Sequence, residues 1–230
     1  MTEIEKAKKL HKKGEYERAV KLLKSAAKSG DVEAAFMLAE IYYYGYGVKE
    51  DDTEAVVWLT KAAEKGHTEA QYMLGNCYYY GEGVEIDLAL AAKYYLAAAK
   101  KGHADAAYSI GDCYSLGQGV EQNRAEAARF IKEAAKGGLA DARVEIGEMY
   151  LDGNGVAKDE SEAVKWFTLA AESGYTDGMY ALGLCYENGR GVPCDLDKAK
   201  EKYALAAESG HVGAKKALCR LDEKMSKRRF

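Results

Sequence analysis

A pair of glycines returns every 36 residues along this 230-residue chain, and no insertion or deletion interrupts the series. The pairs are Gly45 and Gly47, Gly81 and Gly83, Gly117 and Gly119, Gly153 and Gly155, and Gly189 and Gly191. Single glycines keep the same period at Gly30, Gly66, Gly102, Gly138, Gly174 and Gly210. A fixed period of about 20–50 residues is typical of solenoids, in which each unit buries its apolar face only against its neighbours. The period therefore predicts a repeat solenoid.

Each period contains two stretches whose apolar residues fall on one helical face. In the second copy, Ala70, Leu74 and Cys77 have this spacing, and Tyr94 and Ala98 have it further along. We call the two expected helices of a repeat helix A and helix B. The glycine pair should end helix A, because glycine adopts positive φ angles without strain. The chain is thus expected to be all-α, with about 13 helices in stacked helix-loop-helix repeats.

Several positions that recur in phase have a structural interpretation. A buried apolar spine is expected from Leu38, Leu74, Ile110, Ile146 and Leu182. Half-buried tyrosines are expected at Tyr42, Tyr78, Tyr114, Tyr150 and Tyr186. Caps for helix B are expected from Asp51, Asp87, Asn123, Asp159 and Asp195. Glycines inside helix A cost about 1 kcal/mol each relative to alanine, so a neighbouring helix should approach closely at Gly75, Gly111, Gly147 and Gly183.

The ends of the chain differ from its middle, as the ends of a stacked array must. Residues 1–30 form an expected capping helix pair without the glycine pair, and residues 31–210 form five 36-residue repeats. Residues 211–230 form an expected closing helix that ends in the basic tail Lys227-Arg228-Arg229-Phe230. We expect one continuous solenoid domain.

Composition narrows the classes of function. The net charge of −4 lacks the basic excess of nucleic-acid binders, and no apolar run is long enough to span a membrane. The first residues lack the apolar core of a signal peptide, so a cytoplasmic location is expected. We also expect the chain to be a monomer. No cysteine or histidine cluster has metal-ligand spacing, and we expect no metal and no cofactor.

The five cysteines are expected to be unpaired. Cys77, Cys113 and Cys185 share one repeat position, and equivalent positions in stacked repeats lie about 10 Å apart, too far for a disulfide. These three should be small buried residues. Cys194, beside Pro193 in a loop, is expected to be the accessible thiol.

These repeats resemble the Sel1-like repeat family, a relative of the tetratricopeptide repeat. The second copy carries the family pattern at Ala70, Tyr72, Leu74, Gly75, Tyr78, Gly81, Gly83, Val84, Asp87, Ala91, Tyr94, Ala98, Ala99 and Gly102. The resemblance covers five copies over about residues 34–213, and the first helix pair looks more like a tetratricopeptide unit. It implies a right-handed superhelix and a non-enzymatic adaptor that holds proteins or peptides on a concave surface lined by A helices. Secreted relatives linked to β-lactam binding carry a disulfide in every repeat, and this chain lacks that cysteine pattern.

The tetratricopeptide register predicts which side chains line the concave face. They are Phe36, Glu40, Tyr43, Tyr44, Tyr72, Asn76, Tyr79, Tyr80, Tyr108, Asp112, Glu148, Tyr180 and Glu187. An acidic, tyrosine-rich groove favours protein or peptide partners of basic or aromatic character.

Simpler interpretations exist for some in-phase residues. Carboxylates in the first turn of helix A, such as Glu33 and Glu69, stabilise the helix dipole without any ligand. His67, His103 and His211 lie where helix A begins, which is typical of loop or capping residues. Trp58 and Trp166 are expected in the core between helices.

Two alternatives to an adaptor remain open at this point. Ser25-Ala26-Ala27-Lys28 matches the Ser-x-x-Lys motif of β-lactamase-like serine hydrolases, although no partner motif follows at a suitable spacing. A purely structural spacer is the other alternative.

Overall fold

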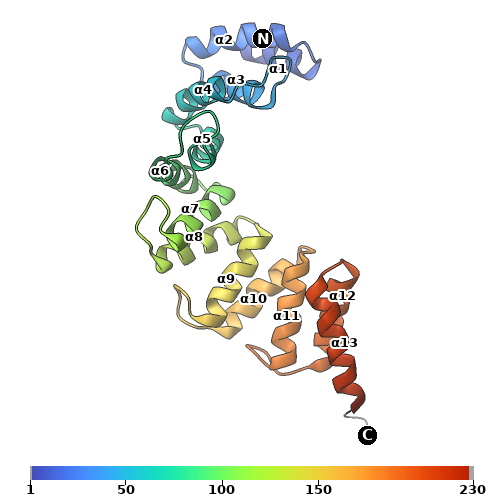
Figure 1. Ribbon diagram of the computed structural model, residues 1–230. Helices are drawn as coiled ribbons and strands as arrows, with labels where there is room; N and C mark the ends of the chain where they lie inside the picture. The colour runs from blue at the N-terminus through green and yellow to red at the C-terminus, as the bar shows by residue number, and fades with distance from the viewer. Residues whose placement is uncertain (1, 228–230) are drawn as a thin grey trace. The chain divides into compact units, whose positions relative to one another are not determined.

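The computed structural model describes residues 2–227 and contains thirteen α-helices and no strand in that range. Of the predicted basic tail, Arg228, Arg229 and Phe230 lie outside the described residues. The helices are α1 (Glu3–Lys12), α2 (Tyr16–Lys28), α3 (Val32–Tyr44), α4 (Asp52–Glu64), α5 (Thr68–Tyr80), α6 (Leu88–Ala99), α7 (Ala104–Leu116), α8 (Arg124–Lys136), α9 (Ala140–Asp152), α10 (Glu160–Glu172), α11 (Thr176–Asn188), α12 (Leu196–Glu208) and α13 (Val212–Lys227) (Figure 1). The all-α solenoid predicted from the period is confirmed.

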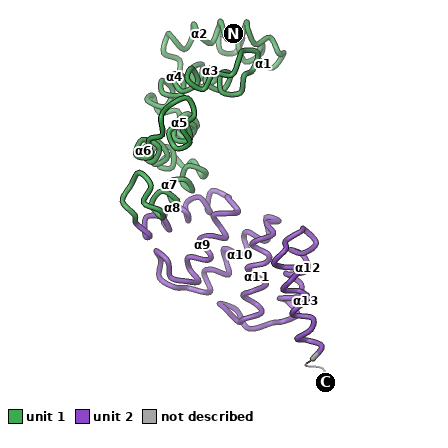
Figure 2. Tube along the Cα trace, in the orientation of Figure 1, with its two compact units in different colours: residues 1–122 green, residues 123–230 purple. Residues whose placement is uncertain are grey.

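The chain divides into two compact units, residues 1–122 and residues 123–230 (Figure 2). Unit 1 contains α1 to α7, and unit 2 contains α8 to α13. Within each unit, helices that follow one another in the sequence pack against one another. Helix A of the repeats is α3, α5, α7, α9 and α11, and helix B is α4, α6, α8, α10 and α12. No helix of the described part is both long and apolar enough to cross a bilayer.

The in-phase positions have the burial that the sequence predicts. The five spine residues are all buried, with Leu38, Leu74, Ile110 and Ile146 at 0% exposure and Leu182 at 4%. The five in-phase tyrosines are half-buried. Trp58 and Trp166 are buried at 4% and 7% exposure, as expected for residues between helices.

Each glycine of the pair has its own role. The first glycine ends helix A in the left-handed conformation; Gly81, for example, has φ 78° and donates its N–H to the carbonyl of Cys77. In the four later pairs the second glycine lies against the backbone at the start of the preceding helix B, and in the first pair Gly47 lies against the Tyr16 side chain. A Cβ at Gly83 would overlap the backbone of Asp52, and a Cβ at Gly155 would overlap that of Arg124. Residues other than glycine are therefore excluded at the second position both by its positive φ and by the lack of space.

The glycines inside helix A receive aromatic rings from the helix B that follows. A Cβ at Gly75 would lie 2.6 Å from the Tyr95 ring, and one at Gly183 would lie 2.6 Å from the Tyr203 ring. A Cβ at Gly147 would overlap Phe167 in the same way. The close approach predicted from these glycines is confirmed at Gly75, Gly147 and Gly183, where a buried aromatic side chain fills the space that a Cβ would take.

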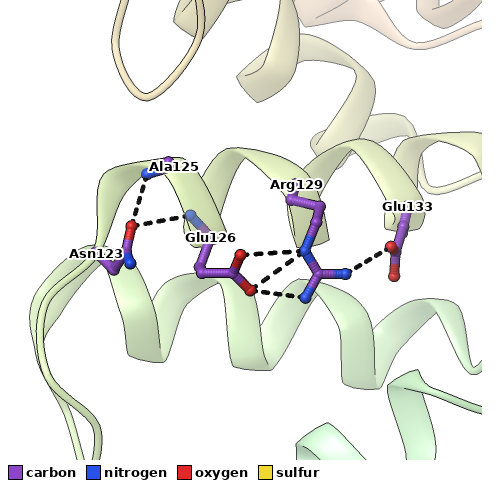
Figure 3. Close-up of polar contacts among 5 residues, drawn as sticks. All are labelled: Asn123, Ala125, Glu126, Arg129 and Glu133. Atoms are coloured by element: carbon purple, nitrogen blue, oxygen red, sulfur yellow. Dashed lines mark hydrogen bonds and ion pairs between the residues drawn. The ribbon is translucent and has the colours of Figure 1, made fainter.

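Helix B begins at the predicted caps. The side chains of Asp51, Asp87, Asn123, Asp159 and Asp195 all accept hydrogen bonds from backbone N–H groups of the first turn. Figure 3 shows Asn123 accepting from the N–H groups of Ala125 and Glu126 at 3.1 Å each. Further along α8, the Arg129 guanidinium forms ion pairs with both Glu126 and Glu133. The hydrogen bond from Arg129 holds the pKa of Glu126 below its usual value. These ion pairs are exposed, so they contribute little to stability.

Four of the five cysteines lie where the sequence predicts, and one does not. Cys77, Cys113 and Cys185 are buried and Cys194 is exposed. Cys219 is also exposed, on the closing helix α13, so the prediction that Cys194 is the accessible thiol is incomplete.

We expect Gly75→Ala to destabilise the protein by about 1–3 kcal/mol, because the added methyl overpacks the Tyr95 ring. Alanine at an ordinary helical glycine would instead stabilise by up to about 1 kcal/mol.

The first repeat carries Ala39 and Leu59 at the same two positions, both fully buried. Urea denaturation of a double-mutant cycle with Tyr95→Leu should therefore give a favourable coupling of about 1 kcal/mol or more. Additive effects would show that the ring does not set the requirement for glycine.

A thiol reagent should distinguish the cysteines. Burial raises the pKa of Cys77 to about 12 and those of Cys113 and Cys185 to about 11. Raised pKa values keep these three thiols protonated at about pH 8. They therefore react slowly, because only the thiolate form is nucleophilic. We expect two thiols, Cys194 and Cys219, to react quickly in the native protein and the other three only after unfolding. Fast labelling of a Cys194→Ser/Cys219→Ser variant would contradict this.

Candidate functional site

A pocket of about 290 Å³ lies between α3 and α5 in unit 1. We call it the aromatic pocket; its lining residues are Phe36, Glu40, Tyr43, Tyr44, Glu69, Tyr72, Met73 and Asn76. Six of the thirteen predicted site residues meet here. The pocket forms because both segments are helix A of successive repeats, so the same register turns the same face of each helix toward it.

Helical spacing positions the lining residues. On α3, Phe36, Glu40 and Tyr43 follow one another at intervals of four and three residues, which places them on one face. On α5, Glu69, Tyr72 and Asn76 follow at three and four. The Asn76 Oδ1 accepts a hydrogen bond from the Tyr95 hydroxyl at 2.8 Å, which fixes the orientation of the amide.

Two aromatic side chains that line the pocket stack on histidines of the next repeat. Phe36 stacks on the His67 ring with 4.2 Å between centroids, and Tyr72 stacks on His103 at 4.6 Å. Each histidine is the N-cap of its own helix A, and the His103 Nδ1 accepts from the Ala106 N–H at 3.1 Å. The prediction that these histidines are capping residues is confirmed.

The same histidines contact the acidic residues of the preceding repeat. The Nε2 atoms of His67 and His103 lie 3.4 Å from Glu33 and 3.1 Å from Glu69, and the His211 Nε2 lies 3.2 Å from Asp177. Sequence reasoning assigned the carboxylates to the helix dipole and missed this pairing. The signal was present, because acid and histidine recur in phase 34 residues apart.

The paired tyrosines divide into a structural and an exposed member. The Tyr43 hydroxyl donates to Glu82 at 2.9 Å, and the Tyr79 hydroxyl donates to Gln118 at 2.9 Å. Glu82 and Gln118 lie between the two glycines of the next loop, so these hydroxyls tie one repeat to the next. Burial and the Glu82 carboxylate together raise the pKa of Tyr43. The hydroxyl therefore stays protonated and remains a donor.

Tyr44 and Tyr80 are the exposed members, at 52% and 64%. Leu116 holds the same position in the third repeat and is 65% exposed. We call Tyr44, Tyr80 and Leu116 the apolar stripe; each is the last residue of its helix A, directly before the glycine cap. In unit 2 the equivalent residues are Asp152 and Asn188, which are polar and exposed. The two units therefore present different chemistry at one repeat position.

The other predicted residues lie apart from the aromatic pocket. Tyr108 and Asp112 are half-buried on α7. In unit 2, Glu148 is exposed and lines a separate cavity of about 430 Å³ between α9 and α11. Tyr180 stacks on His211 with 4.5 Å between centroids.

Glu187 does not offer the free groove carboxylate that the sequence predicts. It is 9% exposed, and its carboxylate accepts from the Tyr203 hydroxyl and from Arg220, each at 2.7 Å. Arg220 lies on α13, so the helix that follows the fifth repeat supplies a partner for this carboxylate. Glu187 is therefore a structural residue.

The hydrolase alternative loses its structural basis. Ser25 and Lys28 are both exposed on α2, and neither lines the aromatic pocket or the cavity beside α9. A serine nucleophile needs a base and oxyanion donors that converge on one pocket. The structure therefore gives no support to a hydrolase site at this motif.

Comparison with known proteins identifies the repeats. The family model described as the Sel1 repeat matches residues 10–31, 32–67, 68–103, 104–139, 140–175 and 176–211. A Sel1 repeat protein from Oxalobacter formigenes is similar over 95% of this chain and 87% of its own, with 32% identity and a TM-score of 0.81. The protective antigen c5321 of uropathogenic Escherichia coli, which displays an SLR fold, is similar over 87% of this chain with 33% identity and a TM-score of 0.83. This chain spans 43% of that antigen's length. No curated protein matches the chain.

The histidine cap can be tested by comparing two substitutions. We expect His103→Ala to lower the free energy of unfolding by about 1 kcal/mol, because the Ala106 N–H loses its acceptor. His103→Asn should lose less, because asparagine is a favourable N-cap. Urea denaturation measures both. Equal losses for the two variants would mean that stacking on Tyr72, rather than capping, is the main contribution.

Proposed function

The chain belongs to the Sel1 repeat family, and we propose that it is a non-enzymatic scaffold that binds protein or peptide segments along the A-helix face of unit 1. Sel1 repeats generally serve protein–protein interaction. The proposal adds to that general role a location and a chemistry: the apolar stripe and the aromatic pocket beside it.

The apolar stripe is the observation that carries the proposal. Three large side chains lie exposed at one position of three successive repeats, at 52%, 64% and 65%. Exposed aromatic residues give contact area at low conformational cost, and tyrosine is enriched among residues that dominate binding energies. Neighbouring repeats present equivalent positions in series, which suits a partner segment that runs across several repeats.

The polar surroundings favour the same kind of partner. Glu40 and Glu69 line the aromatic pocket, so the surface combines aromatic area with negative charge. Such a surface attracts partners with basic and aromatic side chains and speeds their encounter. We propose that the chain acts as a monomer in this role.

A capture experiment tests the proposal. The baits are the unaltered chain, a Tyr44→Ala/Tyr80→Ala variant, and an Asp152→Ala/Asn188→Ala variant that changes the same repeat positions in unit 2. Proteins retained from a lysate of the source organism are identified by mass spectrometry, and the strongest candidate is purified for calorimetry. We expect the unit 1 variant to bind about tenfold or more weakly, since each central tyrosine contributes on the order of 1–2 kcal/mol.

The unit 2 variant is the matched control and should bind as the unaltered chain does. Circular dichroism should show equal helicity for all three baits, because every substituted side chain is exposed. Equal affinity for both variants would place the binding surface elsewhere and contradict the proposal. A chain that captures no partner would favour a structural spacer.

A further inference from the structure

Glu40 is a half-buried carboxylate for which no ion pair or hydrogen bond is found among residues 2–227. The two other carboxylates nearby have partners: Lys8 lies 2.7 Å from Glu33, and His103 lies 3.1 Å from Glu69. Desolvation, together with the charges of Glu33 and Glu69, raises the pKa of Glu40. A positive group placed beside Glu40 would offset both the desolvation of its charged form and the repulsion from the neighbouring carboxylates.

Aromatic rings surround this carboxylate. Phe36, Tyr43, Tyr44 and Tyr72 line the same pocket, and the Tyr44 ring at its rim is 52% exposed. The faces of aromatic rings attract cations, most strongly where water is partly excluded. The pocket volume of about 290 Å³ lies at the lower limit of small-molecule sites, so it suits one long side chain.

Unit 2 shows what the chain places in the equivalent pocket. Three periods of 36 residues separate Glu40 from Glu148, and the cavity beside Glu148 is also lined by Asp152 and Arg190. The Arg190 guanidinium lies 3.7 Å from Asp152 and 3.7 Å from Glu160, and it donates to the Leu151 carbonyl at 3.4 Å. This pocket therefore contains a guanidinium from the chain itself.

The repeat position of Arg190 is occupied by Glu82 in unit 1. The Glu82 carboxylate accepts a hydrogen bond from the Tyr43 hydroxyl. Glu82 is negatively charged at the repeat position where unit 2 has the positively charged Arg190. Lysines of α1 line the adjacent cavity of about 660 Å³ together with Glu40, but the ion pair found there joins Lys8 to Glu33. The aromatic pocket itself has acidic and aromatic lining residues and no basic one.

We propose that the aromatic pocket receives an arginine side chain of the bound partner segment, with the guanidinium beside Glu40 and against the tyrosine rings. The inference rests on the proposed function, because the arginine belongs to a segment bound along the A-helix face. Arginine fits better than lysine, since its planar guanidinium stacks on rings and is more weakly hydrated than an ammonium. The partner supplies in unit 1 the group that Arg190 supplies in unit 2.

The probe for this proposal is N-acetyl-arginine amide, followed by chemical-shift changes of the backbone amides of the isotope-labelled chain. N-acetyl-citrulline amide has nearly the same shape without the charge, and N-acetyl-lysine amide has the charge without the plane. We expect saturable shifts at Glu40, Tyr44 and Tyr72, with affinity in the order arginine, lysine, citrulline. Glu40→Gln should weaken arginine binding about fivefold or more, since it removes the ion pair. Tyr44→Leu, which keeps an apolar side chain, should weaken it less.

Glu148→Gln is the matched control, because it changes the same repeat position in the pocket that holds Arg190. It should leave arginine binding unchanged. Four results would each overturn the proposal. The citrulline probe could bind as tightly as the arginine probe, or Glu40→Gln could leave the affinity unchanged. The shifts could map to another surface, or none could appear up to the solubility limit of the probe. If the Tyr44→Ala/Tyr80→Ala chain loses its protein partner while the arginine probe leaves the pocket unaffected, the scaffold function stands and the arginine site alone is refuted.

Discussion

The repeats depend on close contacts that glycine alone allows. In the second, fourth and fifth repeats an aromatic ring of helix B lies against the glycine inside helix A, as Tyr95 does at Gly75 and Tyr203 at Gly183. In four of the five loops the second glycine lies against the backbone of the preceding helix B, as Gly83 does at Asp52. One contact closes the repeat and the other joins it to its neighbour. Since each unit of a solenoid contacts only its neighbours, these contacts help to set how the repeats stack.

This regular framework lets adjacent residues have different roles. Tyr43 and Tyr79 use their hydroxyls to hold the next glycine loop, whereas Tyr44 and Tyr80 extend from the ends of the same helices into solvent. The helical repeat of 3.6 residues separates consecutive side chains by about 100°, so one tyrosine faces the neighbouring repeat when the next does not. A binding surface can then change without loss of the fold. The change from Tyr44 to Asp152 at one repeat position follows this rule.

Much of the candidate site could be predicted from register, because helical phase determines which side chains share a face. Phe36, Glu40 and Tyr72 were predicted on that basis, and they line one pocket. The partners of those side chains could not be predicted in the same way. The pairing of His103 with Glu69 joins two repeats, and the burial of Glu187 depends on Arg220 of the closing helix. Contacts between elements distant in sequence depend on how far each side chain reaches, which periodicity does not describe.

The sequence by itself determined the all-α solenoid, the position of every glycine cap and the buried spine. It could do so because period, apolar phase and the positive φ of glycine are local properties repeated five times. Only the tertiary structure decided which tyrosine is structural, which carboxylates have a partner, and that Arg190 lines the pocket of unit 2 whereas the aromatic pocket of unit 1 has no basic lining residue. The contacts among them join side chains of different repeats, and the distances that decide such contacts exist only once the helices have packed.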